Sequence, residues 1–526
     1  MKSSINIIKK TTVATTMTAL LVACSLEPEL TSTYTEDVLW KNENNVELYL
    51  NSFYPLIGSD YYADAIGDDG FSDIAKMTLP HSNQNLWAFG SVTIEPANNI
   101  FDNWSWGYNW VTQINRFLDG LKTKGAHLPR ALREKAEGEA RFFRAHVYFM
   151  MARRYDANLI IYPELPVLGD SNHAMSTPNE VWDFIQSDLE FAALHLPAKE
   201  SAPSGKLTSG AAHGLLARTM LYAGRWKVAS DAAATVMSMD YDLYPDYGDM
   251  FTIRRTNGTT NKESIIEFGF IKPELAYNFD SMYSPPGESG FCYATPTEDL
   301  VSQYEMADGT PFSWSEHGSD PYTNREPRFY ASVLYNGAPW KGRLIETFEG
   351  GLDGWGYGGN TTCTGYYLRK FLDPEMTTFD TNDFTCYYMR FAEVLLIYAE
   401  AQAELNDIPE ALKALNRVRA RVNLPPVTAA GKEDFMSKLR HERMVELAFE
   451  GHRFWDLRRW DLAKSTLGNT HLTGVKPVKQ GSTVTYQIID CDNGRTRIYL
   501  DKYRRFPIPY TEIKANKLIE QFEEWR

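Results

Sequence analysis

The sequence contains few cysteines. There are five in 526 residues, at positions 24, 292, 363, 386 and 491. No two of them form a C-x-x-C pair, so the spacing argues against a zinc ribbon. If the first cysteine is set aside, the other four allow zero, one or two disulfides, and the sequence does not choose among these.

Basic charge is also scarce. The chain has 53 Lys and Arg against 68 Asp and Glu, a formal net charge of −15. Phosphate backbones reward Lys and Arg, so this balance argues against a nucleic-acid-binding protein. Acidic residues are common on solvated surfaces, and the charge therefore excludes some partners without identifying one.

Complete catalytic motifs are absent. No G-x-S-x-G occurs, and the His-Glu pair at 441–442 starts an H-E-x-x-H motif whose last position, 445, is valine. Residues 354–359 match G-x-G-x-x-G, but no clear strand precedes them and no helix follows, so we interpret them as a loop. The adjacent carboxylates Asp68 and Asp69 fit no EF-hand spacing. We therefore expect no enzyme, no metal site and no cofactor.

No apolar run is long enough to span a bilayer near the N-terminus. Residues 11–23 are uncharged but too short, and they follow three lysines among the first ten residues. This is the form of a secretory signal. Its end, Leu-Val-Ala-Cys at 21–24, resembles the bacterial lipobox, so we expect residues 1–23 to be a lipoprotein signal peptide and Cys24 to be lipidated. The alternative is a plain signal peptide with an incidental cysteine.

Apolar residues at helical spacing are the dominant pattern in the sequence. Residues 131–155 place apolar side chains at three- and four-residue spacing on one face, and further helices are expected after Pro178 and at 388–422 and 433–450. An internal repeat relates residues 215–234 to 397–416. Its matched pairs share one offset: Ala217 with Ala399, Gly224 with Asn406, and Ala229 with Ala411.

The repeat has the helix–turn–helix pattern of a tetratricopeptide unit, with small residues where two helices meet; the alternative is two unrelated helical hairpins. Between the copies the chain is dense in Gly, Pro, Asn, Tyr and Trp, with strand-like runs at 264–271 and 328–335. We expect a predominantly α fold in which a helical scaffold carries long loops. The expected parts are the signal peptide, a helical scaffold at 24–244 with ligand loops at about 61–110, a loop-rich insertion with short strands at 245–385, and a C-terminal helical region at 386–526.

Several stretches carry a family resemblance. EARFFRAHVYFMMARRY, RFAEVLLIYAEAQAELN, RHERMVELAFEGHRFWDLRRW and RFPIPYTEIKANKLIEQ resemble, in order, the motifs of the SusD/RagB-like nutrient-binding lipoproteins of Bacteroidetes. The likeness runs over essentially the whole chain. The RHERMV stretch concentrates Arg, His and acids, and we interpret it as a helix locked to its neighbours by ion pairs, with Trp455 and Trp460 packed inside.

The resemblance implies a role. Such proteins are lipid-anchored in the outer membrane, face the extracellular side, cap a SusC-like TonB-dependent transporter and deliver oligosaccharides or, in some members, peptides to it. Glu27 and Glu29, just after Cys24, resemble the signal that sends these lipoproteins to the cell surface. A SusC-like transporter, an oligosaccharide and the membrane are therefore the expected partners, with no nucleic acid.

A sugar-binding site stacks an aromatic ring under the sugar and points polar groups at its hydroxyls. Two loops, 67–89 and 287–293, have this mixture and correspond to ligand loops of the family. Segments that resemble the border of the family's site add an arginine and a tyrosine. The predicted glycan-binding residues are Trp87 and Tyr293 as aromatic platforms, with Asp68, Asp69, Asn85, Cys292, Arg369 and Tyr388; Trp314, Trp340 and Trp355 rank lower.

Three other functions stay open. A peptide site would favour a long cleft with main-chain partners. A surface glycosidase would need two carboxylates held about 5–10 Å apart across a cleft, which sequence neighbours such as Asp68 and Asp69 rarely achieve. A purely structural lipoprotein would need neither site.

Overall fold

The computed structural model describes residues 39–58, 61–91, 94–166, 169, 172–255, 261–355, 360–377 and 379–526. The expected signal peptide and lipidated Cys24 lie outside these residues, as do positions 356–359 of the G-x-G-x-x-G stretch. Within the described part, no helix is both long and apolar enough to cross a membrane.

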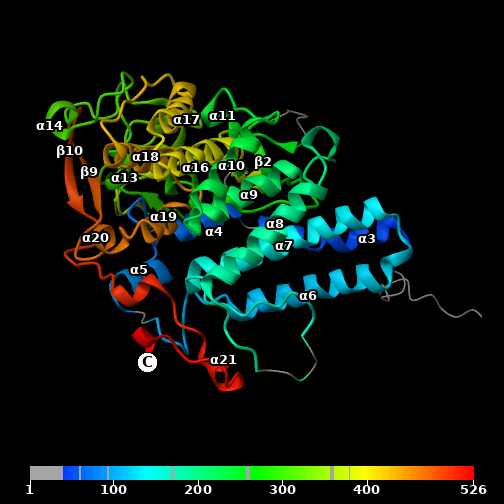
Figure 1. Ribbon diagram of the computed structural model, residues 1–526. Helices are drawn as coiled ribbons and strands as arrows, with labels where there is room; N and C mark the ends of the chain where they lie inside the picture. Colours follow the sequence, from blue (N-terminus) through cyan, green and yellow to red (C-terminus); the bar gives the residue numbers. More distant parts are fainter. Residues whose placement is uncertain are drawn as a thin grey trace, which may run out of the picture.

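A scaffold of antiparallel helices occupies much of the chain (Figure 1). Consecutive helices pack on one another, so the chain advances as helical pairs. Pro178 starts α8, where Thr177 forms a capping box with Glu180. The scaffold helices are α3 (Glu43–Asn51), α6 (Trp104–Thr123), α7 (Arg130–Tyr155), α8 (Pro178–His195), α9 (Ser209–Tyr222), α10 (Trp226–Met237), α16 (Phe391–Glu404), α17 (Ile408–Arg421) and α18 (Lys432–Glu446).

The internal repeat is confirmed as two helical hairpins, α9–α10 and α16–α17. The paired turn residues have the same left-handed backbone, with φ 68° at Gly224 and 66° at Asn406. This conformation favours Gly and Asn, which explains why those residues match in the repeat. The four matched alanines are fully buried where the helices approach: Ala217, Ala229, Ala399 and Ala411.

Helix α10 packs directly on α16, although 153 residues separate Met237 from Phe391 (391 − 237 − 1). The intervening chain forms the loop-rich part of the molecule. Its short helices are α11 (Tyr247–Met250), α12 (Phe279–Tyr283), α13 (Glu298–Val301), α14 (Trp314–His317) and α15 (Pro327–Ser332). Its strands are β2 (Ser264–Phe268), β3 (Ala294–Pro296), β4 (Val333–Leu334), β5 (Pro339–Trp340), β6 (Arg343–Leu344), β7 (Tyr367–Leu368) and β8 (Cys386–Arg390).

The described strands form two-stranded antiparallel sheets: β1 (Ala75–Met77) with β3, β2 with β8, β4 with β7, β5 with β6, and β9 (Thr473–Gln480) with β10 (Thr483–Asp490). The β9–β10 hairpin projects from one edge of the molecule (Figure 1). The remaining helices are α4 (Tyr61–Asp69), α5 (Asn83–Ala88), α19 (Arg453–Arg459), α20 (Ala463–Leu467) and α21 (Tyr510–Ala515).

Two segments differ from the sequence-based expectation. Residues 61–110 are only partly loop, because α4, α5 and the start of α6 lie within them. The run 328–335 is mostly helix α15, with only Val333 and Leu334 in a strand. Pro327 takes the first turn of that helix, where its missing N–H costs nothing, and the buried partners of Arg328 hold the turn in place.

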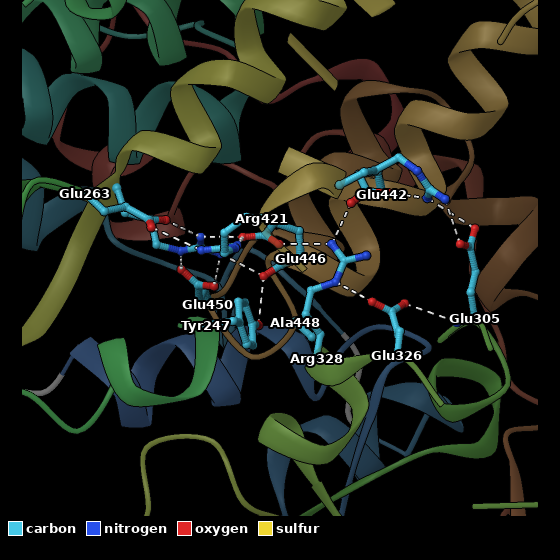
Figure 2. Close-up of polar contacts among 12 residues, drawn as sticks. Tyr247, Glu263, Glu305, Glu326, Arg328, Arg421, Glu442, Glu446, Ala448 and Glu450 are labelled. Carbon is cyan, nitrogen blue, oxygen red and sulfur yellow. Dashed lines mark hydrogen bonds and ion pairs between the residues drawn. The ribbon is translucent and has the colours of Figure 1, made fainter. Parts of the chain in front are cut away.

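Buried ion pairs join α17 and α18 to the loop-rich part, through Arg421 with Glu263 and Glu442 with Arg328 (Figure 2). The fully buried Arg328 of α15 pairs with Glu326 at 2.6 Å, Glu442 at 2.5 Å and Glu446 at 3.0 Å. Arg390 at the end of β8 likewise pairs with Glu446 at 2.6 Å. The ion pairs confirm the interpretation of the RHERMV stretch, which forms α18 and α19; Trp455 is buried as expected, whereas Trp460 is only partly buried.

Candidate functional site

Three aromatic rings lie together on the surface of the loop-rich part; we call Phe291, Tyr293 and Phe379 the aromatic platform. The rings of Phe291 and Tyr293 stack with centroids 5.7 Å apart and planes 22° apart. Phe379 meets Phe291 at 6.3 Å, edge to face. Phe291 is 38% exposed, Phe379 is 65% exposed and Tyr293 is half-buried. The platform therefore offers the ring faces that the apolar side of a sugar requires.

The β1–β3 ladder holds Tyr293 in position. Tyr293 directly precedes β3, its N–H donates to the carbonyl of Met282 at 2.8 Å, and its carbonyl accepts from the N–H of Thr78 at 3.0 Å. Cys292 has a left-handed backbone (φ 48°) and a fully buried thiol, whose pKa is raised by that burial. Cys292 thus anchors the loop in the core while Phe291 and Tyr293, on either side of it, stay accessible.

A cavity of about 580 Å³ adjoins the platform. Met77 lines this cavity and pairs with Ala294, the residue after Tyr293. Tyr283 also lines it, and burial and the neighbouring Asp64 and Tyr293 raise the pKa of its phenol. None of the three platform residues lines this cavity, but Met77 and Tyr283 lie next to both; we call it the adjoining cavity and treat it with the platform as the candidate site.

Tyr388, a predicted site residue, lines the adjoining cavity with His146. The Nε2 of His146 lies 3.1 Å from the carbonyl of Leu56 and must donate to it, which leaves Nδ1 to accept from the Tyr388 hydroxyl at 3.2 Å. Burial lowers the pKa of His146 to about 3, so its imidazole is neutral at physiological pH. Both ring nitrogens of His146 are therefore engaged within the protein, and its imidazole brings no charge to the cavity.

Asp68 also lines the adjoining cavity. Its Oδ2 accepts from the indole N–H of Trp455 at 2.7 Å and lies 3.5 Å from Arg153. Asp69 is fully buried instead, and its carboxylate accepts from the backbone N–H groups of Gly451 and Arg453. Burial raises the pKa of Asp69 well above its usual value. The two carboxylates therefore do not face each other across a cleft, as a glycosidase pair would.

The structure places Trp87 in the core, which corrects its expected role as a stacking platform. The side chain is 1% exposed and packs edge to face against Phe71 and Phe454, with ring centroids 5.5 and 5.8 Å away. Asn85 is also buried, and its amide donates to the carbonyls of Met77 and Leu79. Together with Asp69, these residues shape the 67–89 loop and offer no group to a ligand.

The other predicted residues lie elsewhere. Arg369 lines a separate cavity. Of the lower-ranked tryptophans, Trp340 is 4% exposed, and the indole N–H of Trp314 donates to buried Glu298 at 2.7 Å. Sequence reasoning missed Phe291 and Phe379. Phe291 precedes Cys292 in the GESGFCY stretch, and the two aromatic residues on either side of a small one could have indicated that both rings face the same surface. Phe379 lies in no recognisable sequence pattern.

The described residues contain no cluster of three or more His, Cys, Asp or Glu that could hold a metal ion. His441, which starts the incomplete H-E-x-x-H motif, lies 2.7 Å from the carbonyl of Gln303. Its neighbour Glu442 pairs with Arg328 and Arg419. The platform offers stacking, and the lining of the adjoining cavity offers polar side chains.

Comparison with known proteins gives consistent matches along the chain. A family model described as "SusD family" matches residues 236–525, and one described as "Starch-binding associating with outer membrane" matches residues 26–221. A "SusD-like protein" of Bacteroides ovatus is 24% identical over 479 residues, which cover 86% of this chain and 82% of that protein.

Solved structures agree in fold. A SusD-like protein from Bacteroides fragilis has a TM-score of 0.81 and 28% identity, covering 93% of this chain and 98% of that one. A "SusD-like carbohydrate binding protein" from the same species has a TM-score of 0.79 and 26% identity, covering 92% and 100%. Because the first family model spans more than half of the 526 residues, the chain belongs to the SusD family.

Proposed function

We propose that this protein is a cell-surface glycan-binding lipoprotein that captures oligosaccharides at the aromatic platform and delivers them to a SusC-like TonB-dependent transporter. The observation that carries the proposal is the exposed Phe291–Tyr293 stack beside a polar cavity in a chain of the SusD family. A solved relative is described as carbohydrate binding, which agrees with this reading.

The physical basis is the match between a sugar and the site. The stacked rings supply apolar area for the C–H face of a sugar. The adjoining cavity supplies hydrogen-bonding groups, among them Asp64, Asp68 and Gln84. Binding of this kind needs no covalent step, so the protein acts as a receptor and the transporter carries out import.

Membrane attachment completes the proposal. Lipidation of Cys24 would tether the domain through the residues that precede Leu39, the first described residue. Each buried lipid methylene contributes about 0.8 kcal/mol, so two or more chains hold a soluble domain at a membrane. The acids at 27 and 29 are the proposed signal for display on the extracellular side.

A binding screen tests the proposal. The chain from residue 25 onward, which keeps every described residue, is titrated calorimetrically against a panel of neutral oligosaccharides. We expect one class to bind, and Tyr293→Ala and Phe291→Ala each to weaken that binding by about tenfold or more, the equivalent of about 1.4 kcal/mol. The matched control is Tyr510→Ala, which removes a 49% exposed tyrosine of α21 and should leave the affinity unchanged.

The other outcomes of the binding screen distinguish the alternative functions. Glycan binding that survives both platform variants would retain the function and reject the platform. Saturable binding of peptides with no binding of any glycan would identify a peptide receptor. Release of shorter sugars during incubation would identify a glycosidase.

A further inference from the structure

A second cavity, of about 430 Å³, lies between α11, α15 and the segment that follows β7; we call it the Arg369 cavity. Its volume is within the range of about 300–1,000 Å³ that is common for small-molecule sites. It shares no lining residue with the adjoining cavity. The Arg369 cavity is therefore physically separate from the candidate site described above.

Arg369 is a cation of this cavity whose guanidinium has no acceptor among the described residues. Its backbone N–H donates to the carbonyl of Ser332 at 3.0 Å, which fixes the residue after β7. Its guanidinium lies 5.7 Å from the ring centroid of Trp340, and within the described residues it forms no ion pair and no side-chain hydrogen bond. Burial lowers the pKa of Arg369 despite the nearby Tyr335 hydroxyl.

The other cations of the same cavity are neutralised by the protein. Lys370 donates to Glu450 at 2.7 Å and to the Tyr247 hydroxyl at 2.8 Å. Arg421 pairs with Glu263 at 3.1 Å and with Glu446. Of these three, only Arg369 has neither an ion pair nor a side-chain hydrogen bond among the described residues, and its guanidinium nitrogens remain accessible from the cavity. A ligand that supplies the acceptors would form charge-assisted hydrogen bonds with this guanidinium.

The charged residues of the cavity restrict the class of ligand that it can bind. A guanidinium presents its donors in a planar fork that matches a carboxylate or sulfate group bidentately. Asp246 and Asp249 also line the cavity, and Asp246 already accepts from the N–H of Asp249 at 2.9 Å. A carboxylate such as Asp249 repels a second anion nearby but accepts from hydroxyl groups. The cavity therefore suits a ligand with one oxyanion at one end and hydroxyls at the other.

We propose that the Arg369 cavity binds an anionic sugar, a saccharide unit that carries a carboxylate or a sulfate ester, with Arg369 as the partner of the oxyanion. The saccharide class rests on the proposed function, whereas the anionic character rests on Arg369 itself. This gives the protein a second sugar site that is independent of the aromatic platform and selects for charge.

The test is calorimetric titration with three matched disaccharides: a neutral one, one with a uronate and one with a sulfate. We expect at least one anionic sugar to bind about tenfold or more tightly than the neutral one, and the preference to weaken as salt rises from about 50 to 500 mM. Comparison of the uronate with the sulfate arm identifies the oxyanion.

Arg369→Gln should abolish the preference, and Arg369→Lys should keep part of it, because a lysine retains the charge but loses the planar fork. The control is Arg495→Gln, since Arg495 also lies over an aromatic ring (Phe89, 3.8 Å) and forms no ion pair within the described part of the chain. Thermal unfolding of all variants checks that they are folded.

Three results would overturn the inference. The first is no preference for either anionic sugar up to about 10 mM, a limit that corresponds to a very weak complex. The second is a preference that Arg369→Gln leaves intact. The third is a preference lost in Tyr293→Ala but kept in Arg369→Gln, which would move the anion to the platform. Binding of neutral glycans at the platform is measured separately. A negative result for the anionic sugars would therefore not contradict the proposed function.

Discussion

Trp87 of α5 and Tyr293, just before β3, are both aromatic residues, and their surroundings give them different roles. The indole of Trp87 is enclosed by a cluster that includes Phe71, Phe101 and Phe454. Among the described residues, the ring of Tyr293 stacks on Phe291 alone, and it remains half-buried. At the scale of the residue, burial decides that Trp87 stabilises the fold and that Tyr293 is open to a ligand.

Trp87→Ala should lower the free energy of unfolding by about 3–5 kcal/mol, because it leaves a cavity inside the aromatic cluster. Tyr293→Ala should change it by no more than about 1 kcal/mol, since the ring is partly solvated. Urea denaturation of both variants and of the parent protein measures these free energies of unfolding. Equal effects of the two substitutions would contradict the different roles assigned to these rings.

Two histidines, the buried His146 and the partly buried His452, make stability depend on pH. Burial lowers the pKa of His146 to about 3 and that of His452 to about 4. Both are well below the value of about 6.5 for an unfolded chain. Between its folded and unfolded pKa values, each histidine is protonated in the unfolded state but neutral in the folded state. The free energy of unfolding is therefore unaffected by these groups above about pH 6.5 and declines as the pH falls below it.

We expect His146→Gln to make the decline in unfolding free energy between pH 6 and 4.5 shallower than in the parent. One histidine protonated only in the unfolded chain contributes a slope of about 1.4 kcal/mol per pH unit. Denaturant titrations across that range supply the slopes. Identical slopes for variant and parent would mean that His146 is already protonated in the native protein.

At the scale of the element, the repeat turns explain how two distant hairpins share one geometry. Gly224 and Asn406 each end a helix with a left-handed residue that reverses the chain. The added Cβ of an alanine at 224 would meet nothing closer than Trp226 at 3.8 Å. The constraint at this turn is therefore backbone conformation, with no steric conflict involved.

Gly224→Ala should destabilise the protein by about 1–2 kcal/mol, the cost of placing a Cβ in the left-handed region. Asn406→Gly is the complementary change and should be neutral or slightly stabilising, because glycine adopts that region without the same penalty. Thermal unfolding of each variant reports the difference. A neutral Gly224→Ala would show that the turn can relax into another conformation.

At the scale of the whole molecule, the buried ion pairs connect the helical scaffold to the loops that carry both candidate sites. Burial raises the pKa of the Glu446 carboxyl, but Arg421, Arg390 and Arg328 outweigh it, and the net pKa falls well below the usual value. Its stabilising contribution is therefore present above the unfolded value of about 4.3 and is lost as pH falls below it.

Glu446→Gln should lower the free energy of unfolding by about 3–5 kcal/mol at neutral pH, because it leaves buried arginines without their shared carboxylate. The control is Asp231→Asn, which breaks the exposed pair with Lys227 and should cost no more than about 0.5 kcal/mol. Chemical denaturation at pH 7 measures both. A loss below about 1 kcal/mol for Glu446→Gln would show that the network contributes little to stability.

The amino-acid sequence by itself determined the helical scaffold, the repeat and the family. Apolar residues at helical spacing define α7, and the matched Gly224 and Asn406 define the turns, because both signals depend on residues close together in the chain. The sequence also pointed to Tyr293 and to the ion pairs of α18, since their local motifs are distinctive.

Only the tertiary structure decided which side chains are accessible and which charges are matched. The clusters that bury Trp87, the partners that make 327–332 a helix, and the absence of a partner for Arg369 within the described residues all depend on groups far away in the sequence. Exposure and charge pairing are properties of packed neighbours. Local patterns could name candidate residues, but the fold separated the platform at Tyr293 from the core at Trp87 and from the cavity at Arg369.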